Sequence, residues 1–178
     1  AILGFGFERR ALILQGCVIP RALFGYSVNA MGVRHLAQLQ SAVLRTLWGD
    51  GRARRCKEVV LTLFVKGHLL DLCQAADYGT MVTWRRMLLR RPDLHAWFQD
   101  VWNQGSRGRA WRIGPVQRIR SILKRLGWNW PAPFAIITDE GIEFNILQTS
   151  SGTWMHEIRE ALRRNLWRRA AVRREDMR

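Results

Sequence analysis

The stretch PVQRIRSILKRLG at residues 115–127 decides the fold, because it carries a complete helix with both of its end signals. Proline is favoured at the first helical position and glycine directly after the last one. The apolar residues between them recur at helical spacing on one face, namely Val116, Ile119, Ile122, Leu123 and Leu126. The opposite side carries Arg118, Arg120, Lys124 and Arg125. The stretch therefore predicts an amphipathic helix with a buried apolar face and a positively charged outer face.

Downstream of this helix the apolar pattern changes from helical spacing to alternation. WNWPAP at 128–133 is expected to be a rigid aromatic connector. FAIITDEGIEFNIL at 134–147 predicts a β-hairpin, with Gly141 in the left-handed position of a three-residue loop. The apolar side of its second strand is Ile142, Phe144 and Ile146. Thr153 is then expected to cap a last helix, which carries Trp154, Ile158, Ala161 and Leu162.

Upstream of residue 115 the chain is also mostly helical in pattern. Residues 2–7 could form a short strand, and residues 9–24 are apolar and predict a helix. A clear helical period begins at Leu36, with Leu39, Val43, Leu44 and Leu47 on the same face. Residues 56–66 are apolar almost all round, so that periodicity does not separate a buried helix from a strand; we expect a helix.

Two more helices are predicted between residues 71 and 102. Asp71 is expected to be the N-cap of a helix that ends at about Arg91, because Pro92 follows. Asp93 is expected to cap the next helix. The apolar face of that helix is predicted to be Leu94, Trp97, Phe98, Val101 and Trp102. The sequence as a whole therefore predicts a mainly α fold with one small β-hairpin near residues 134–147.

The charge of the chain indicates a polyanionic partner. The 178 residues have a formal net charge of +15 and a pI of about 11.5, and lysine occurs only at 57, 66 and 124. Arginine forks fit phosphate groups better than lysine does, so that nucleic acid is the expected partner. A GC-rich genome would also raise the arginine content without any function, and that alternative stays open.

Cysteine use and hydropathy bear on the location of the protein. The three cysteines, Cys17, Cys56 and Cys73, are far apart and form no CxxC motif, which indicates core thiols in a reducing compartment. No apolar run reaches the ~20 residues of a membrane span. We expect an intracellular, nuclear protein. The chain begins and ends like the inside of a longer polypeptide, and we expect it to be a fragment.

Basic residues stand in four groups that could contact phosphates. The first group follows the helix that ends in LWG at 47–49, and the other groups lie near Trp84, near Trp111 and on the helix at 115–126. The candidate nucleic-acid-binding residues are Arg52, Arg54, Arg55, Lys57, Arg85, Arg86, Arg107, Arg109, Arg112, Arg118, Arg120 and Lys124. The alternative for each group is an ordinary solvated surface.

Signals for a reaction centre are missing from the sequence. His35, His68, His95 and His156 have no finger or zincin spacing with a cysteine or with one another. ADYG at 76–79 lacks the paired aspartates of a two-metal polymerase site, and no P-loop or G-x-S-x-G motif occurs. We identify no catalytic and no metal-binding residue, and whether the chain belongs to an enzyme stays uncertain at this point.

The order of several motifs resembles the end of the palm and the thumb of non-LTR retrotransposon reverse transcriptases. These motifs are ILGFGF at 2–7, PRALFGY at 20–26, LQSAVLRTLWG at 39–49, KGHLLD at 66–71 and GPVQRIRSILKRLGWNWPAPF at 114–134. FGY stands here where YG is usual in the family. The resemblance covers nearly the whole chain, and it implies a thumb-like bundle in residues 1–105 and a connection-like part in residues 106–178.

The resemblance also implies a function. The chain would grip an RNA or RNA–DNA duplex as part of an RNA-directed DNA polymerase, and the remainder of the polymerase polypeptide would be its second partner. The palm, which would bind Mg²⁺, lies outside this sequence, so no cofactor is expected here and the chain alone is not expected to polymerise. Two alternatives stay open: a retroelement remnant that folds without specific binding, and a membrane-surface protein, which the spread of arginines over several elements disfavours.

Overall fold

The computed structural model describes residues 6–26, 32–48, 57–58, 61, 66–106 and 114–175. The chain forms two compact units. Unit 1 consists of residues 1–26, 30–78 and 162–178, and unit 2 of residues 27–29 and 79–161. The predicted boundary between two parts of the chain lay between residues 105 and 106, and the observed division is different. Each of two long helices begins in one unit and ends in the other.

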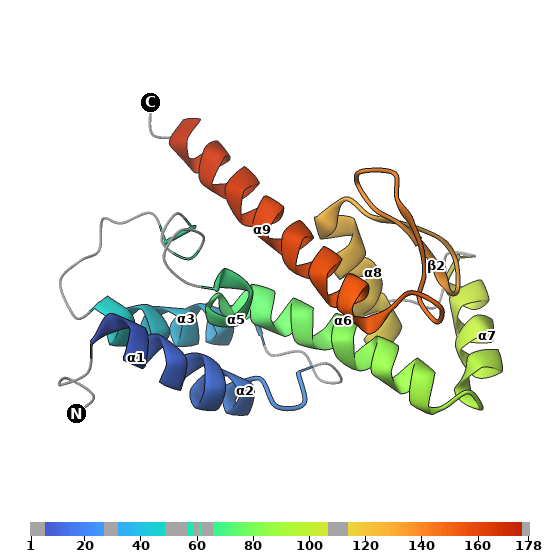
Figure 1. Cartoon of the computed structure of the whole chain (residues 1–178), viewed down its shortest axis with the longest axis horizontal. Helices are drawn as coiled ribbons and strands as arrows, with labels where there is room; N and C mark the ends of the chain where they lie inside the picture. The colour runs from blue at the N-terminus through green and yellow to red at the C-terminus, as the bar shows by residue number, and fades with distance from the viewer. Residues whose placement is uncertain are drawn as a thin grey trace. The chain divides into compact units, whose positions relative to one another are not determined.

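In the described part of unit 1, all regular secondary structure is helical. Its helices are α1 (Phe7–Ile13), a π-helical turn η1 (Leu14–Val18), α2 (Ile19–Ala22), α3 (Val33–Trp48), α5 (Gly67–Leu70), the start of α6 (Leu72–Arg90) and the end of α9 (Ser151–Glu175). Figure 1 shows α1 and α3 side by side. Leucine side chains from α3, α5 and α6 form most of the core with Leu14, Ile19 and Leu166.

The helices predicted for unit 1 are largely confirmed. The expected helix at 9–24 is present as α1, η1 and α2, and the helical period from Leu36 lies within α3. Asp71 caps α6 as predicted, because its carboxylate accepts the backbone N–H of Gln74 at 3.0 Å. Residues 2–7 were expected to form a strand, but the last of them, Phe7, is the first residue of α1. Most of the helix expected at 56–66 lies outside the described residues.

Unit 2 contains two whole helices and a three-stranded antiparallel sheet. The helices are α7 (Leu94–Ser106) and α8 (Pro115–Leu126), and the strands are β1 (Asn129–Ala132), β2 (Ala135–Ile137) and β3 (Glu143–Asn145), in the order β1-β2-β3. The predicted hairpin is confirmed as β2 and β3. Gly141 has a φ of +81°, and the backbone N–H of Thr138 donates to Ile142 across the loop at 2.9 Å.

The aromatic connector predicted at 128–133 is wrong in part, because it contains β1. Ala132 pairs with Ala135, so that Pro133 and Phe134 form a tight turn between the first two strands. Proline cannot donate a ladder hydrogen bond and is tolerated on edge strands. Pro131 lies on such an edge, since β1 has a neighbour on one side only.

The amphipathic helix at 115–126 is confirmed as α8. All five predicted apolar residues are buried, and Gly127 ends the helix in the left-handed conformation at φ +79°. The N–H of Trp128 donates to the carbonyl of Leu123 at 2.9 Å, the bond that closes a Schellman motif. In Figure 1 the helix lies beside the sheet, and its C-terminal end leads directly into β1.

Aromatic rings fill the core of unit 2. Trp84 of α6 packs against Phe98, Trp130 and Trp154, with ring centroids 5.9, 5.4 and 6.4 Å away. Trp97, predicted to lie on the same apolar face as Phe98, is 59% exposed. The buried side of α7 is centred on Phe98, which leaves Trp97 at its edge. Ile142 is also more exposed than predicted, because it closes the hairpin loop and does not lie within β3.

Two smaller predictions are also wrong. The N-cap of α9 is Ser150 and not Thr153, because Ser150 Oγ accepts the backbone N–H of Thr153 at 3.1 Å. Cys17 and Cys73 were expected to be core thiols, but both are exposed. Cys56 lies outside the described residues. The number and spacing of cysteines therefore say little about which face of a helix a thiol occupies.

Candidate nucleic-acid interface

Half of the predicted phosphate-binding residues have a described position. Arg52, Arg54, Arg55, Arg107, Arg109 and Arg112 lie outside the described residues. Lys57 lies in unit 1, and Arg85, Arg86, Arg118, Arg120 and Lys124 lie in unit 2. The described six have different environments, from buried to exposed.

Arg85 is not available to a phosphate, which corrects its place among the predicted residues. Its side chain is buried, and it donates from Nε to the carbonyl of Ile146 at 2.7 Å and from Nη1 to Ser151 Oγ at 2.9 Å. Nη2 donates to the carbonyl of Thr149. Burial lowers the pKa of the guanidinium from its usual value. Arg85 therefore ties α6 to the segment between β3 and α9.

Arg86, the next residue, is exposed and lies on an exposed stripe of α6. The stripe consists of Gly79, Thr83, Arg86 and Arg90, all of them exposed. Their spacing of i, i+4, i+7 and i+11 places them on one helix face. A Cβ atom built on Gly79 meets nothing within 4 Å. This face can approach an extended anion closely and offers two guanidinium groups to it.

The outer face of α8 is the second basic surface. Lys124 and Arg125 are exposed, whereas Arg118 and Arg120 are half-buried at the two edges of the apolar face. Arg120 Nη1 lies 3.4 Å from the carbonyl oxygen of Gly105 at the end of α7. Residues 101–138 contain seven Arg or Lys and no Asp or Glu. The cationic side chains of this region therefore have no carboxylate within their own segment.

The charge of unit 2 changes sign directly after α8. Residues 126–158 contain four acidic residues and no Arg or Lys. Asp139, Glu140 and Glu143 of this segment are exposed at the hairpin. A polyanion would be attracted to the helix and repelled from the hairpin, so the two segments give the unit a basic and an acidic part.

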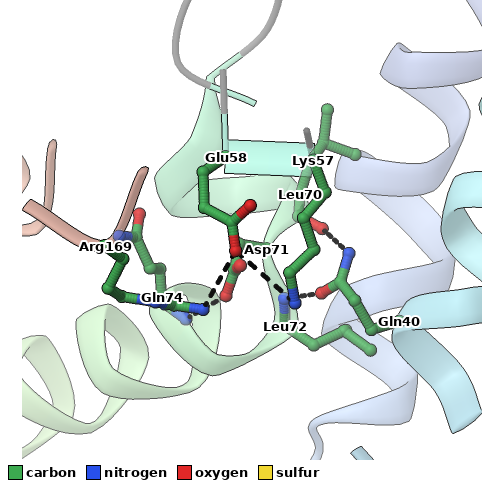
Figure 2. A network of polar contacts seen from close by, with 8 residues as sticks. All are labelled: Gln40, Lys57, Glu58, Leu70, Asp71, Leu72, Gln74 and Arg169. Carbon is green, nitrogen blue, oxygen red and sulfur yellow. Dashed lines mark hydrogen bonds and ion pairs between the residues drawn. The ribbon is translucent and has the colours of Figure 1, made fainter. Parts of the chain in front are cut away.

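Lys57 belongs to a buried polar network in unit 1 (Figure 2). Its Nζ lies 3.9 Å from a carboxylate oxygen of Glu58, and Arg169 of α9 lies 3.8 Å from the same oxygen. The Glu58 side chain is 1% exposed. Loss of one cationic partner of a buried carboxylate strongly destabilises the fold. Lys57 and Arg169 therefore compensate an internal charge, and Lys57 is less free to bind phosphate than a solvated lysine.

The same network fixes the break between α5 and α6, as Figure 2 shows. Gln40 of α3 donates from Nε2 to the carbonyl of Leu70 at 3.3 Å, and its Oε1 accepts the N–H of Leu72 at 2.6 Å. Gln74 donates from Nε2 to the carbonyl of Leu162 at 2.7 Å. The amide of Gln40 satisfies buried backbone groups where α5 gives way to α6, and the amide of Gln74 satisfies a carbonyl of α9. Both roles are structural.

Arg91, next to the exposed stripe, forms an ion pair with Asp93. Its guanidinium donates two hydrogen bonds to Asp93, at 2.9 and 2.7 Å. The hydrogen bond from Arg91 lowers the pKa of the Asp93 carboxyl, and the same contact raises the pKa of Arg91. Asp93 directly precedes α7, where the sequence predicted a helix cap, and its carboxylate also binds this arginine.

The sequence reading missed the residues that anchor this region and the full extent of its basic faces. Glu58 directly follows Lys57 in the sequence, and its second cationic partner, Arg169, is distant in sequence. Arg90 and Arg125 are not among the twelve predicted phosphate-binding residues. The exposure of Arg90 follows from its spacing of four residues from Arg86 on one helix face, so this signal was present in the sequence.

The described part of the chain contains no cluster of three or more His, Cys, Asp and Glu placed to hold a metal ion. Within those same residues, no helix is both long and apolar enough to cross a membrane. No protein-family model, no curated protein and no solved structure matches this chain.

Proposed function

We propose that this chain binds the backbone of a nucleic-acid duplex, as the template–primer-binding portion of a retroelement RNA-directed DNA polymerase. The observation that carries the binding is the outer face of α8. It presents Lys124 and Arg125 to solvent from a segment of 38 residues, 101–138, without a single carboxylate. Phosphate contacts of this kind position a protein on a duplex without reading its sequence.

The stripe of Gly79, Thr83, Arg86 and Arg90 supports the same proposal. Arginine and threonine side chains are common donors to phosphate oxygens, and the absence of a side chain at Gly79 leaves open space beside them. The acidic hairpin restricts where the duplex can lie, because like charges repel. The duplex is expected to lie along the basic helices and away from Asp139, Glu140 and Glu143.

The retroelement assignment rests on the order of motifs along the chain, from ILGFGF at 2–7 to the aromatic segment that ends at Phe134. In this role a separate palm performs the polymerisation and binds Mg²⁺, the rest of the polymerase polypeptide is a partner, and the place of action is the nucleus. Duplex binding does not depend on these further assignments and is tested by itself.

The test is the salt dependence of binding to an RNA–DNA hybrid duplex, measured by fluorescence anisotropy. Each phosphate neutralised contributes a slope of about −0.9 in log K against log salt on B-form DNA, a value that we carry over to the hybrid. Replacing Lys124 and Arg125 by alanine is expected to flatten this slope by about 1–2 units.

Ser121→Ala is the matched control, because Ser121 is exposed on the same helix and carries no charge. It is expected to leave the slope unchanged. A double variant that binds with the parental slope would contradict a contact at α8. If the parent itself showed no salt-dependent binding, the chain would be better explained as a folded remnant without a nucleic-acid partner.

A further inference from the structure

Trp97 and Trp167 are the most exposed tryptophans of the described residues, with 59% and 42% of their surface open to solvent. The other tryptophans with a described position each pack against another aromatic ring. Within the described part of the chain, these two have no such ring partner. Single apolar side chains are common on protein surfaces, so the surroundings of each ring decide whether it can serve as a binding site.

The two rings differ in the charges around them. On α7, Asp100 follows Trp97 by three residues, and Asp93 precedes Trp97 by four. On α9, by contrast, residues 161–174 contain six arginines and no Asp or Glu. An anionic ligand is therefore attracted to the surroundings of Trp167 and not to those of Trp97.

Trp167 lies on the outer face of α9, between a cation and a small residue. Arg163, Trp167 and Ala171 are all exposed and follow one another at intervals of four residues on one helix face. Leu162 and Leu166 of the same helix are buried in the protein. Side chains of a helix lean towards its N-terminus, so the residue that would lean over the ring is Ala171. Its methyl group leaves room beside the ring.

A planar ring among guanidinium groups suits an unpaired base with its phosphates. Aromatic rings stack on every kind of base in a single strand, and arginine forks fit phosphate groups. A duplex offers no free base faces along its length, because its bases stack on one another. Helices that lie in a membrane surface present a broad apolar face, whereas the line of Arg163, Trp167 and Ala171 contains one large apolar side chain.

We propose that the outer face of α9 binds single-stranded nucleic acid, with one base stacked on Trp167 and neighbouring phosphates bound by Arg163 and Arg168. Both arginines are exposed, whereas Arg169 lies beside the buried carboxylate of Glu58. The inference shares its ligand class with the proposed function but rests on α9 alone. These residues belong to unit 1, and the basic faces of α6 and α8 belong to unit 2.

The test is the affinity of the full chain for a short labelled oligothymidylate, measured by fluorescence anisotropy. Trp167→Ala is expected to weaken binding about fivefold or more, as loss of one stacked base does. Ala171→Leu keeps the ring and every charge and is expected to weaken binding as well, because leucine leans over the ring. Trp97→Ala is the matched control and is expected to leave the affinity unchanged, since it removes an exposed ring that lies beside acidic residues.

An abasic oligonucleotide of the same length separates stacking from charge. The parent is expected to bind it more weakly than the oligothymidylate, and Trp167→Ala is expected to have no further effect. Arg163→Ala and Arg168→Ala together are expected to flatten the slope of log K against log salt by roughly 1–1.5 units, at about 0.7 for each phosphate on a single strand. Trp167→Ala is expected to leave this slope unchanged.

Two results would overturn the proposal. One is an oligothymidylate affinity that Trp167→Ala and Ala171→Leu both leave unchanged, in variants shown to be folded by circular dichroism. The other is an equal loss on the abasic strand, because the ring would then act without a base. Capture by phosphatidylserine vesicles that depends on Trp167, without binding to the oligonucleotide, would assign the face to a membrane surface instead. Duplex binding through Lys124 and Arg125 can persist in each of these cases, so the two proposals fail separately.

Discussion

Arg85 and Arg86 are adjacent in sequence and have opposite environments. Arg85 is buried and donates hydrogen bonds to Ile146, Thr149 and Ser151, whereas Arg86 is exposed on the outer stripe of α6. Arg85→Ala would leave these acceptors without a donor. Hydrogen bonds to charged groups contribute ~1.5–3 kcal/mol each, so we expect a loss of about 2–4 kcal/mol in the free energy of unfolding, measured by urea denaturation.

The neighbouring variant is the control for this prediction. Arg86→Ala is expected to change the unfolding free energy by less than about 0.5 kcal/mol, as for other exposed substitutions. Arg85→Lys is expected to recover part of the loss only, because one ammonium group does not reproduce the planar fork of arginine. Equal stabilities of Arg85→Ala and Arg86→Ala would show that the clamp between α6 and the segment before α9 does not form.

The contact between Arg91 and Asp93 makes a prediction about acid titration. The pKa of Asp93 is depressed in the folded state, chiefly by the hydrogen bond from Arg91. Its stabilising contribution is therefore present above the unfolded pKa of ~3.9 and is lost as the pH falls through the lower folded value. Arg91→Gln is expected to raise the folded pKa of Asp93 towards its ordinary value, measured by carbon NMR of the carboxyl group.

Arg90→Gln removes the same charge one residue earlier and is the control for that titration. It is expected to leave the pKa of Asp93 largely unchanged, because the hydrogen bonds come from Arg91. A pKa of Asp93 that moves equally in both variants would mean that the general field of the arginines, and not the contact, depresses it.

At the residue scale the sequence separated apolar from polar positions better than it separated one arginine from another. Helical spacing follows from the hydrophobic pattern, and it placed the buried residues of α8 correctly. Whether an arginine is solvated or clamped depends on carbonyl groups that are distant in sequence, such as the one Arg85 finds 61 residues away at Ile146. No local pattern around Trp84 carries that information.

At the scale of one element, α8 carries the sharpest prediction about stability. Ile122 is 1% exposed at the centre of its apolar face. Ile122→Ala is expected to lower the unfolding free energy by about 2–5 kcal/mol, as large-to-small changes in cores do. Lys124→Ala, two residues further on and exposed, is expected to have a small effect. An unchanged urea midpoint for Ile122→Ala would mean that α8 does not bury this face.

Helices and strands were predictable where their sequence signals are local, and less so where a neighbouring element determines the conformation. The hairpin of β2 and β3 follows from alternation and from a glycine at a position with φ +81°. β1 was missed because WNWPAP contains two prolines, which argue against a strand in isolation. Only the presence of β2 beside it makes this segment an edge strand. The N-cap of α9 was predicted at Thr153 and is Ser150, because both residues have side chains that can cap a helix.

At the scale of the whole molecule, the sequence predicted the mainly helical class but not the division into units. α6 and α9 are long helices whose residues belong partly to each unit. A sequence pattern marks where a helix begins and ends, and it does not mark where along a helix the contacts change from one core to another. The burial of Glu58 and Gln74 is similarly invisible in sequence, because polar residues are usually exposed.

The basic connector after α3 provides the test of binding at the scale of the whole molecule. Lys57 is excluded from this test, because it helps to compensate the buried Glu58 and its loss would confound binding with stability. The variant is therefore Arg52→Ala, Arg54→Ala and Arg55→Ala together. If these three side chains contact phosphates, the slope of log K against log salt is expected to flatten by about 2–3 units on a duplex, at about 0.9 for each contact.

Single-stranded nucleic acid supplies an internal comparison for the same variant. There each contact contributes about 0.7, so the slope is expected to flatten less, by roughly 2 units. Binding should weaken on every sequence alike, because phosphate contacts carry no base specificity. Stability should be retained if these side chains are solvated, and circular dichroism before each titration checks this. Parallel salt lines for the parent and the variant would mean that these arginines are a solvated connector, and duplex binding would then depend on α6 and α8 alone.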